Sequence, residues 1–422
     1  MRLGAGNAAG IALAGSLSSF TTASSTRKYK ALEDLSPMTG DVVPITLEER
    51  LSRVEKVQQL MAQNKMEALV LDSGTSLKYF TGISWWPSER TMVAVIPAKG
   101  DVKYVCPAFE AERLRQLIKI GKEVRTWEEH ESPYKQVAGL FKDYNIRTGN
   151  IGMEERLRFF VFDGIRKEAS ALNYVNGDAV TMPCRLVKTA AELALMQKAN
   201  DITIAAYKVG ISLLHEGMTP HEFTEITAEA HAKLGAGGGI DVNFGEASAY
   251  PHGSIEPQHL KKGDIVLMDG GCQVEGYSSD ISRTIVFGAA PTKRQREIWD
   301  LEKKAQLAGF AAAQLGSPCE NVDFAARKVI VDAGFGPDYK IPGLPHRTGH
   351  GIGMDGHEWG NMVKGNKQPL QAGMCFSIEP NISIYGEFGV RLEDCAYMTT
   401  EGVKWFSPTS VSIEEPIPGF KV

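Results

Sequence analysis

The sequence predicts an α/β N-terminal domain followed by an α+β C-terminal domain whose sheet is largely antiparallel. In the first half, strand-like apolar runs alternate with helical patterns, which is typical of α/β folds. In the second half, long helical patterns are followed by runs of strands, which favours α+β. The chain has 422 residues and, at about 100–200 residues per domain, has room for two to three domains.

The composition excludes several classes of protein. Hydrophobic residues make up 43% and charged residues 23%, as in soluble globular chains, so neither a disordered chain nor a collagen-like fibre fits. The 46 Lys and Arg against 51 Asp and Glu give a net charge of −5, and no long basic run suggests a nucleic acid partner. No apolar stretch reaches the roughly 18 residues of a membrane span. The six cysteines contain no C-x-x-C pair, which argues against a zinc ribbon or a thioredoxin-type motif.

We assign residues 1–45 to a low-complexity or signal-like segment and a lead-in. Arg2 precedes a run of small apolar residues and then a Ser/Thr cluster, an order that resembles an export signal. The basic region that opens such a signal is nearly absent, so an irregular N-terminus is an equal alternative. The protein is therefore expected to be either cytoplasmic or exported.

The first domain is expected over residues 46–185. Thr46 followed three residues later by Glu49 has the spacing of a capping box, and apolar residues then recur at helical intervals to about residue 64. The other elements expected in this domain are strands at 68–71, 91–96 and 102–106, a helix at 109–118, a helix–strand pair at 134–153 and a helix at 159–172.

The second domain is expected over residues 186–422. Its expected helices are 190–214, 220–234, 293–315 and 321–333, and its expected strands are 242–247, 265–269, 281–287, 374–384 and 390–399. The glycine-rich stretch at 235–239 follows a helix instead of linking a strand to a helix, so a dinucleotide-binding loop is not expected there.

Four carboxylates and one imidazole lie in short motifs of the second domain. Asp269 and Asp280 flank a turn between two strands and should face each other. The others are His350 in Gly-His-Gly-Ile-Gly, Glu379 in Ser-Ile-Glu-Pro and Glu393 in Val-Arg-Leu-Glu-Asp. Any one of these acids alone would be interpreted as a cap or a surface charge. Together they suit a pair of divalent ions such as Mn²⁺, with Co²⁺, Fe²⁺ or Zn²⁺ as alternatives, and burying them without cations would be costly.

In order and local motif these five residues resemble the metal ligands of the creatinase/prolidase/methionine aminopeptidase superfamily, the pita-bread metallopeptidases. The resemblance covers about residues 46–415 and is greatest to prolidase and aminopeptidase P. It implies a curved pita-bread sheet and two metal ions. It also implies that Asp269 and Asp280 bind one ion, that Asp280 and Glu393 bridge, and that His350 and Glu379 complete the second site.

The resemblance also implies roles in catalysis. Glu379 is the candidate proton shuttle for a hydroxide that bridges the two ions. His357 and His252 match active-site histidines of the family, and His357 is expected to hydrogen-bond the substrate carbonyl or the tetrahedral intermediate. Arg391 matches a family arginine that holds carboxylates in place, a role that suits its forked guanidinium. His346 is a further candidate for substrate binding, and for each histidine a structural role is the alternative.

Two tryptophans stand in a loop of the first domain. Trp85 and Trp86 follow a Tyr-Phe-Thr-Gly motif, and in relatives the N-terminal domain of one subunit helps to wall the active site of another. The pair is therefore a candidate wall for a prolyl ring in a homodimer, with ordinary core packing as the alternative.

The resemblance implies an exopeptidase that hydrolyses the Xaa-Pro bond of dipeptides or short peptides. One alternative is a non-peptidase pita-bread metalloenzyme, a C–N hydrolase or a C–S lyase acting on a small metabolite. The creatinase branch lacks the metals, and the lyase branch is expected to carry a further aspartate where this chain has Gly271. A third alternative is a non-catalytic protein-binding module, but such modules lack the five ligands.

One motif departs from the family. Prolidase-like relatives usually read Glu-Pro-Gly-x-Tyr at the second-site glutamate, whereas this chain has Ser383 in place of the tyrosine. If strand alternation continues from Glu379, Ser383 and Tyr385 project to the same face as Glu379, with Tyr385 about 7 Å beyond Ser383 along the strand. Tyr385 is thus a candidate for substrate binding, and we expect Xaa-Pro hydrolysis to persist.

Overall fold

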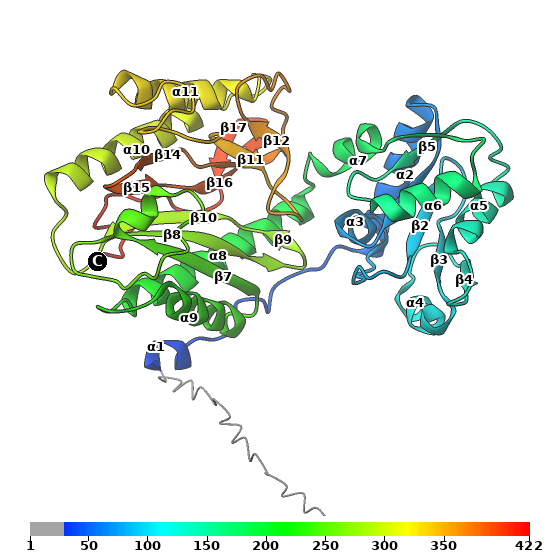
Figure 1. Cartoon of the computed structure of the whole chain (residues 1–422), viewed down its shortest axis with the longest axis horizontal. Coiled ribbons are helices and arrows are strands. Elements are labelled where there is room, and N and C mark those ends of the chain that lie inside the picture. The colour runs from blue at the N-terminus through cyan, green and yellow to red at the C-terminus, as the bar shows by residue number, and fades with distance from the viewer. Residues whose placement is uncertain (1–28) are drawn as a thin grey trace, which may run out of the picture.

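The computed structural model describes residues 29–422, which form two lobes joined by extended chain and by helix α7 (Figure 1). The signal-like stretch of the sequence lies outside the described residues. Helix α1 (Lys30–Glu33) packs beneath the C-terminal lobe before the chain crosses to the N-terminal lobe. No helix in residues 29–422 is long and apolar enough to cross a membrane.

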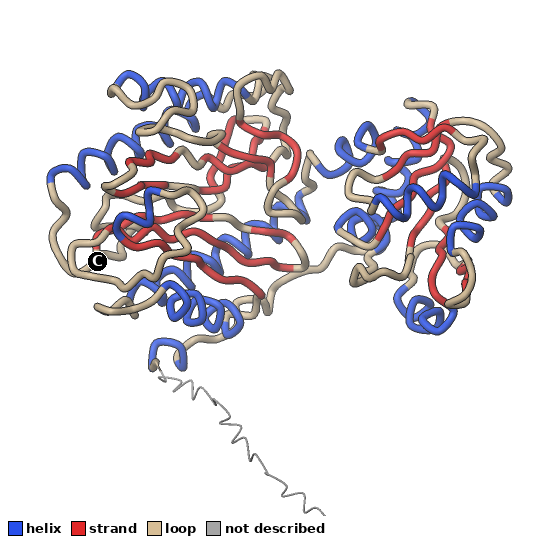
Figure 2. Tube along the Cα trace, viewed as in Figure 1, coloured by secondary structure: helices blue, strands red, loops and turns tan. Residues whose placement is uncertain are grey.

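A six-stranded mixed sheet with the order β4-β3-β2-β1-β5-β6 forms the centre of the N-terminal lobe, and helices cover both of its faces (Figures 1 and 2). The strands are β1 (Met66–Asp72), β2 (Val93–Pro97), β3 (Lys103–Pro107), β4 (Val124–Trp127), β5 (Asn150–Met153) and β6 (Asn173–Asn176). The helices are α2 (Leu47–Gln63), α3 (Thr75–Thr81), η1 (Ala108–Glu110), α4 (Ala111–Leu117), α5 (Pro133–Asp143), α6 (Phe159–Glu168) and α7 (Asp178–Arg185).

Alternation along β1 explains why both faces of this sheet are covered. Leu69 and Leu71 share a core with α2, whereas Ala68 and Val70 share one with α5 and α6. Successive side chains of a strand point to opposite faces, so the continuous apolar run from Ala68 to Leu71 requires a layer on each side. Thr46 caps α2 by accepting the Glu49 N–H at 3.1 Å.

The C-terminal lobe contains three sheets in which every strand pair is antiparallel, as predicted. One sheet holds β7 (Gly237–Phe244), β8 (Ile265–Val274), β9 (Tyr277–Ser278) and β10 (Ile281–Val286). The second holds β11 (Gly349–Gly351), β12 (Glu358–Met362), β13 (Cys375–Ile378), β16 (Asp394–Thr399) and β17 (Gly402–Trp405), and the third holds β14 (Asn381–Ile384) and β15 (Phe388–Arg391). The helices are α8 (Ala190–Ser212), α9 (Pro220–Lys233), η2 (Gly245–Ala249), α10 (Lys293–Ala312) and α11 (Glu320–Asp332).

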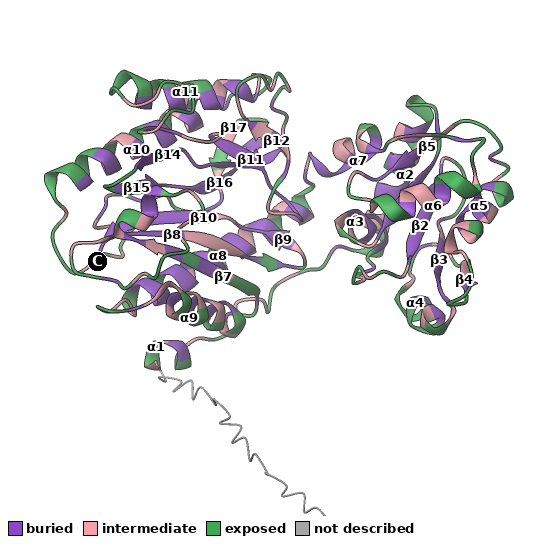
Figure 3. Cartoon of the chain, viewed as in Figure 1, coloured by how far each residue is buried: buried purple, intermediate pink, exposed green. Residues whose placement is uncertain are grey.

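The helices lie on the outside of this lobe and the sheets face one another inside it. Figure 3 shows the strands largely buried and the outer surfaces of α10 and α11 exposed. The first sheet is joined to the chain between β15 and β16 by one bridge, in which Ser282 and Glu393 exchange N–H···O bonds of 3.2 Å. The inner surface of the lobe therefore lies between two sheets that meet at this bridge.

Three predicted elements differ in the structure. The strand expected at 374–384 is divided into β13 and β14 around Pro380, because proline cannot donate to a ladder. The strand expected at 390–399 is likewise divided into β15 and β16. Strand β7 runs from Gly237 to Phe244, so it begins five residues before the strand expected at 242–247. Glycine is required there because a Cβ on Gly238 would lie 2.4 Å from the Gly271 carbonyl oxygen.

Candidate metal centre

The five predicted ligands come from both large sheets and meet between them. Asp269 lies on β8 and Asp280 directly before β10, whereas His350 lies on β11, Glu379 directly after β13, and Glu393 between β15 and β16. Asp269, Asp280 and Glu393 offer ligand atoms that all lie within 4.8 Å of one another, and so do His350, Glu379 and Glu393. Two overlapping groups that share a carboxylate are the arrangement expected of a two-metal site.

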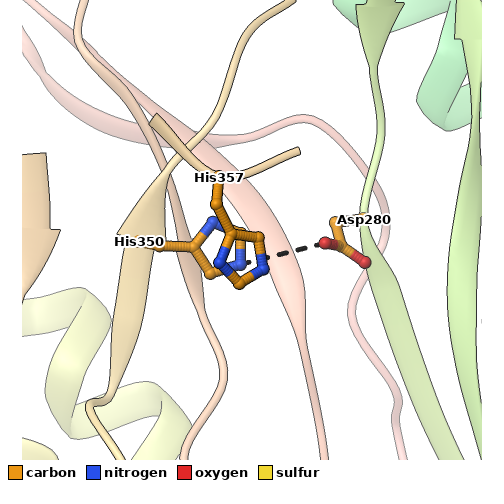
Figure 4. A group of neighbouring side chains, drawn as sticks. All are labelled: Asp280, His350 and His357. Atoms are coloured by element: carbon orange, nitrogen blue, oxygen red, sulfur yellow. Dashed lines mark ion pairs between the residues drawn. The ribbon is translucent and has the colours of Figure 1, made fainter. Parts of the chain in front are cut away.

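The imidazole of His350 lies at the centre of the second group. Its Nε2 is 3.2 Å from Glu379 Oε1, 3.8 Å from Asp280 Oδ2 and 3.9 Å from Glu393 Oε1. Figure 4 shows His350 directed toward Asp280 from the opposite strand. The Ser377 hydroxyl donates to Glu379 Oε1 at 3.2 Å, which fixes that carboxylate from its own strand.

Ser282 and Arg391 hold two of the carboxylates in place. The Ser282 hydroxyl lies 2.8 Å from both Asp269 Oδ1 and Glu393 Oε2, and it accepts a bond of 3.0 Å from Arg391 Nε. One hydroxyl carries one proton, so it donates to one carboxylate at a time. Arg391 Nη2 contacts Asp269 Oδ2 at 2.5 Å, and Nη1 reaches the Pro251 carbonyl at 3.5 Å, so this arginine also holds the loop that carries His252.

Sequence reasoning did not identify Ser282. Its signal was its position two residues after Asp280 at the start of a strand, since residues two apart on a strand project to the same face. In the sheet it is the cross-strand partner of Asp269.

Arg283 lies behind the ligands and was also not identified from the sequence. Its Nη1 donates to the carbonyls of Ser282 and Glu393, each at 2.9 Å. Its Nη2 donates to Asp394 Oδ1 at 2.7 Å and to the Pro408 carbonyl at 2.9 Å. Its Nε donates to the Pro416 carbonyl at 2.9 Å. All five N–H groups of the guanidinium thus have acceptors.

The electrostatics of the cluster favour a bound cation. Burial and then Asp269 raise the pKa of Asp280 well above its ordinary value, and burial and then Asp280 do the same to Glu393. Burial raises the pKa of Glu379 to about 7. Oxygen Oε1 of Glu393 is buried and has no hydrogen-bond partner among the described residues. Burying several neighbouring carboxylates, one with an unpartnered oxygen, costs free energy unless cations balance their charge. Carboxylate oxygens are also ligands that divalent cations prefer.

His357 lies over His350 with its ring nearly parallel, the two centroids 3.7 Å apart and the planes at 16° (Figure 4). Arg347 Nη2 lies 2.7 Å from His357 Nδ1. Because a guanidinium only donates, Nδ1 must be the acceptor, and the neutral ring carries its proton on Nε2. Burial, and then Arg347, lowers the pKa of His357, which favours this neutral ring.

The other two candidate histidines border the same region. His252 is exposed and lines a cavity of about 580 Å³ that also contains Asp241. His346 directs Nδ1 to the Arg347 carbonyl at 2.7 Å, while its Nε2 is buried without a partner among the described residues. Burial lowers the pKa of His346 to about 4, so its ring is neutral at pH 7.

The candidates for substrate binding outside this cluster lie apart from the ligands of their own chain. Trp86 is 85% exposed in the N-terminal lobe, and Trp85 lies under Arg113, whose Cζ is 5.3 Å from a Trp85 ring centroid. Tyr385 stands in the turn between β14 and β15, 53% exposed and stacked on Tyr250 at 5.0 Å. The premise that one strand runs from Glu379 to Tyr385 is wrong, because Pro380 interrupts it.

Ion pairs between the lobes fix the loop that carries His357. Arg185, at the end of α7, contacts Glu358 Oε1 at 2.5 Å and Asp355 Oδ2 at 2.6 Å, and Lys188 contacts Glu358 Oε2 at 2.9 Å. Residues 355 and 358 flank His357, so the junction between the domains positions this histidine. The arginine and lysine are about 170 positions away from their acidic partners in the sequence, so a local sequence pattern could not predict these ion pairs.

Comparison with known proteins identifies the family of each domain. The model of metallopeptidase family M24 matches residues 194–400, and that of the creatinase/prolidase N-terminal domain matches residues 53–187. An Xaa-Pro dipeptidase from Lactobacillus delbrueckii subsp. lactis is 33% identical to this chain, over 86% of this chain and 98% of that protein.

Solved structures give the same result for the fold. A prolidase from Thermococcus sibiricus has a TM-score of 0.78 and 28% identity, covering 85% of this chain and 96% of its own. Dipeptidase PepE from Mycobacterium ulcerans has a TM-score of 0.78 and 30% identity, covering 86% of this chain and 97% of its own. The chain therefore belongs to metallopeptidase family M24, with a creatinase/prolidase N-terminal domain ahead of the domain that holds the candidate metal centre.

Proposed function

We propose that this protein is a metal-dependent dipeptidase that hydrolyses the bond between an N-terminal residue and proline. The observation that carries the proposal is the convergence of four carboxylates and one imidazole beside His357, whose Nε2 is free to donate. Relatives named Xaa-Pro dipeptidase and prolidase match both domains over nearly their full length and support the same activity here.

The donor set supports two ions, with Mn²⁺ as the proposed metal. In this proposal Asp269 and Asp280 would hold one ion and His350 and Glu379 the other, and Asp280 and Glu393 would contribute to both. Carboxylate oxygens with a single imidazole suit Mn²⁺ better than a softer metal. When bound, the ions polarise the substrate carbonyl and activate a water molecule.

The protein's own side chains then carry out the proton transfers and the positioning. Glu379 takes a proton from the attacking water and passes it to the proline nitrogen as the peptide bond breaks. His357 donates from Nε2 to the carbonyl oxygen as negative charge develops on it. His252 and His346 border the same space, and His252 is assigned to catalysis and His346 to substrate binding. Arg391 acts through Ser282 and Asp269 by fixing the carboxylates.

The geometry argues against the C–S lyase alternative. That branch is expected to carry an aspartate at the position of Gly271, but a Cβ there would lie 2.0 Å from the Ser279 carbonyl oxygen. The backbone would have to move to accept any side chain.

A homodimer is the proposed assembly. Trp86, Phe109, Phe159 and Phe160 are all exposed aromatic side chains of the N-terminal lobe. Arg90 and Arg158 pack over two of these rings, at 5.4 Å from Phe109 and 4.8 Å from Phe160. An aromatic surface with arginines is typical of interfaces. Sedimentation at micromolar concentration should give the dimer mass, and a monomer mass would refute the assembly.

The activity is tested with Ala-Pro, Ala-Ala and the tripeptide Ala-Pro-Ala, each assayed with Mn²⁺ and then with chelator. We expect Ala-Pro alone to be cleaved rapidly, and only with the metal present. Asp280→Asn should abolish turnover and lower the bound metal while the circular dichroism spectrum is unchanged. Asp332→Asn, which alters an exposed aspartate on α11, is the matched control. Full activity of a metal-stripped sample would contradict the proposal.

A further inference from the structure

A row of side chains crosses the first sheet and continues beyond the proposed metal ligands. Asp241 on β7 is the cross-strand partner of Asp269, Asp269 is the partner of Ser282, and Ser282 is bridged to Glu393. Directly opposed residues of antiparallel strands project to the same face. Asp241 therefore stands on the face that carries the metal centre, at the outer edge of the sheet and one strand beyond Asp269.

Asp241 lines the cavity of about 580 Å³ that also contains His252. The cavity lies between the start of α9, the edge of β7 and the loop at 252–259. Its lining includes the carboxylates of Asp241 and Glu256 but no lysine or arginine. Asp241 accepts one bond, of 3.3 Å from the Thr224 hydroxyl, and within residues 29–422 it forms no ion pair.

The positive end of α9 also borders this cavity, but it is largely satisfied. The Thr219 side chain accepts the Glu222 N–H at 3.2 Å, and Pro220 has no N–H to offer. The cavity thus keeps an acidic character.

Positive charge lies instead on the side of His357. Arg347 contacts the His357 ring at 2.7 Å, and Arg156 Nη2 donates to the His357 carbonyl at 3.4 Å. A dipeptide is a zwitterion, so this distribution of charge directs its carboxylate toward Arg347 and its first residue toward Asp241.

We propose that Asp241 determines specificity by binding a cationic side chain, that of lysine or arginine, in the first residue of the substrate. This inference rests on the proposed Xaa-Pro dipeptidase activity and names its preferred substrates. The contact is an ion pair between the substrate's ammonium or guanidinium group and the exposed Asp241 carboxylate in an open cavity.

The side chain of the first residue, and not its α-ammonium, is the group that reaches Asp241. The α-nitrogen lies only about 2.5 Å from the scissile carbonyl carbon, so it stays beside the metal ligands. Asp241 is a further strand away, about 4.8 Å across the sheet, a distance that an extended lysine side chain spans.

The test compares Lys-Pro with norleucine-Pro, which has a side chain of similar length without the charge. For the Mn²⁺-loaded enzyme we expect kcat/KM to favour Lys-Pro about two- to fivefold, as for an ion pair with an exposed carboxylate. Asp241→Asn should bring the ratio close to one, Asp241→Glu should retain the preference, and Asp241→Lys should favour Glu-Pro. Glu229→Gln removes the same charge from an exposed position on α9 that does not line the cavity, and it should leave the ratio unchanged.

The outcomes separate this inference from the function on which it rests. Cleavage of neither dipeptide contradicts the Xaa-Pro activity and the inference with it. Equal cleavage of both by the unaltered enzyme contradicts the inference alone. An equal loss on both dipeptides in Asp241→Asn would show that Asp241 binds the α-ammonium, and it also overturns the proposal.

Discussion

The guanidinium of Arg283 donates to the Asp394 carboxylate at 2.7 Å, and both side chains are fully buried behind the candidate metal centre. The same guanidinium donates to the backbone carbonyls of Ser282 and Glu393, the two residues that bridge the sheets. Asp394 is further bonded by Gln306 at 3.0 Å and by Ser407 at 2.7 Å. This pair therefore fixes the backbone on which the proposed ligands stand.

Removing Arg283 should destabilise both the fold and the metal site. Arg283→Ala leaves the Asp394 charge buried without its cation, which costs about 3–5 kcal/mol. Urea unfolding and metal titration should show lower stability and weaker binding. As a control, Arg294→Ala breaks a surface ion pair in which Arg294 and Glu387 lie 3.0 Å apart. It should lower the free energy of unfolding by under about 1 kcal/mol. A loss below 1 kcal/mol in Arg283→Ala would contradict this role.

His357 should affect the rate more than substrate binding. Because Arg347 occupies Nδ1, the ring presents Nε2–H to the substrate oxygen, and loss of such a donor costs about 10²–10³ in kcat. We expect that loss in His357→Ala with the metal content unchanged. Arg347→Met no longer fixes the tautomer and should cost about tenfold. A raised KM with normal kcat would instead mean that His357 only binds substrate.

The junction between the lobes should weaken in acid. Lys188 and Arg185 outweigh the effect of burial and lower the pKa of Glu358 from 4.5 to about 2. An acid whose pKa is depressed in the folded state stabilises the fold above its unfolded pKa, and the contribution is lost as pH falls from about 4.5 to 2. The depression corresponds to about 3 kcal/mol at neutral pH.

Glu358→Gln tests this pH dependence by chemical unfolding between pH 3 and 7. The variant should be less stable than the unaltered protein at pH 7, and the difference should narrow as the pH falls below about 4.5. Glu401→Gln, which alters an exposed pair with Lys404 of 3.4 Å, should change stability little at any pH. A difference that stays constant from pH 7 to 3 would refute the assignment.

The sequence predicted the fold class and the long elements because their signals are local. Helix α2 has its cap at Thr46, and β8 begins with the apolar run Ile265–Met268. The five metal-ligand candidates could be proposed because each stands in a short motif, and the structure brings them together. Short strands such as β11 carry glycine and histidine instead of an apolar pattern, so they were not predicted.

The supporting residues depend on contacts between distant parts of the chain. Arg283 is bonded to residues more than 100 positions away, and Arg185 to a partner 173 positions away. A buried arginine and a surface arginine look alike in one sequence, so neither could be assigned. The same holds for Asp241, whose position beside Asp269 depends on strand register.

Ser383 occupies the position at which the family motif has a tyrosine, and its surroundings predict what a tyrosine would do there. Ser383 is fully buried and accepts a bond of 2.8 Å from Asn381 Nδ2, so its surroundings are packed and satisfied. Ser383→Tyr must force a ring into this space, and overpacking costs about 1–3 kcal/mol. We therefore expect it to lower the free energy of unfolding without raising kcat/KM on Ala-Pro.

Tyr385→Phe should be nearly neutral, because the ring is exposed in a turn and its stacking on Tyr250 needs no hydroxyl. We expect kcat/KM on Ala-Pro within about twofold of the unaltered enzyme, since the hydroxyl contributes no catalytic hydrogen bond worth about 1.5–3 kcal/mol. A tenfold gain in Ser383→Tyr at unchanged stability would show that the absent phenol limits catalysis. No proline-specific cleavage by the unaltered enzyme or by either variant would instead favour a non-peptidase function for the same metal centre.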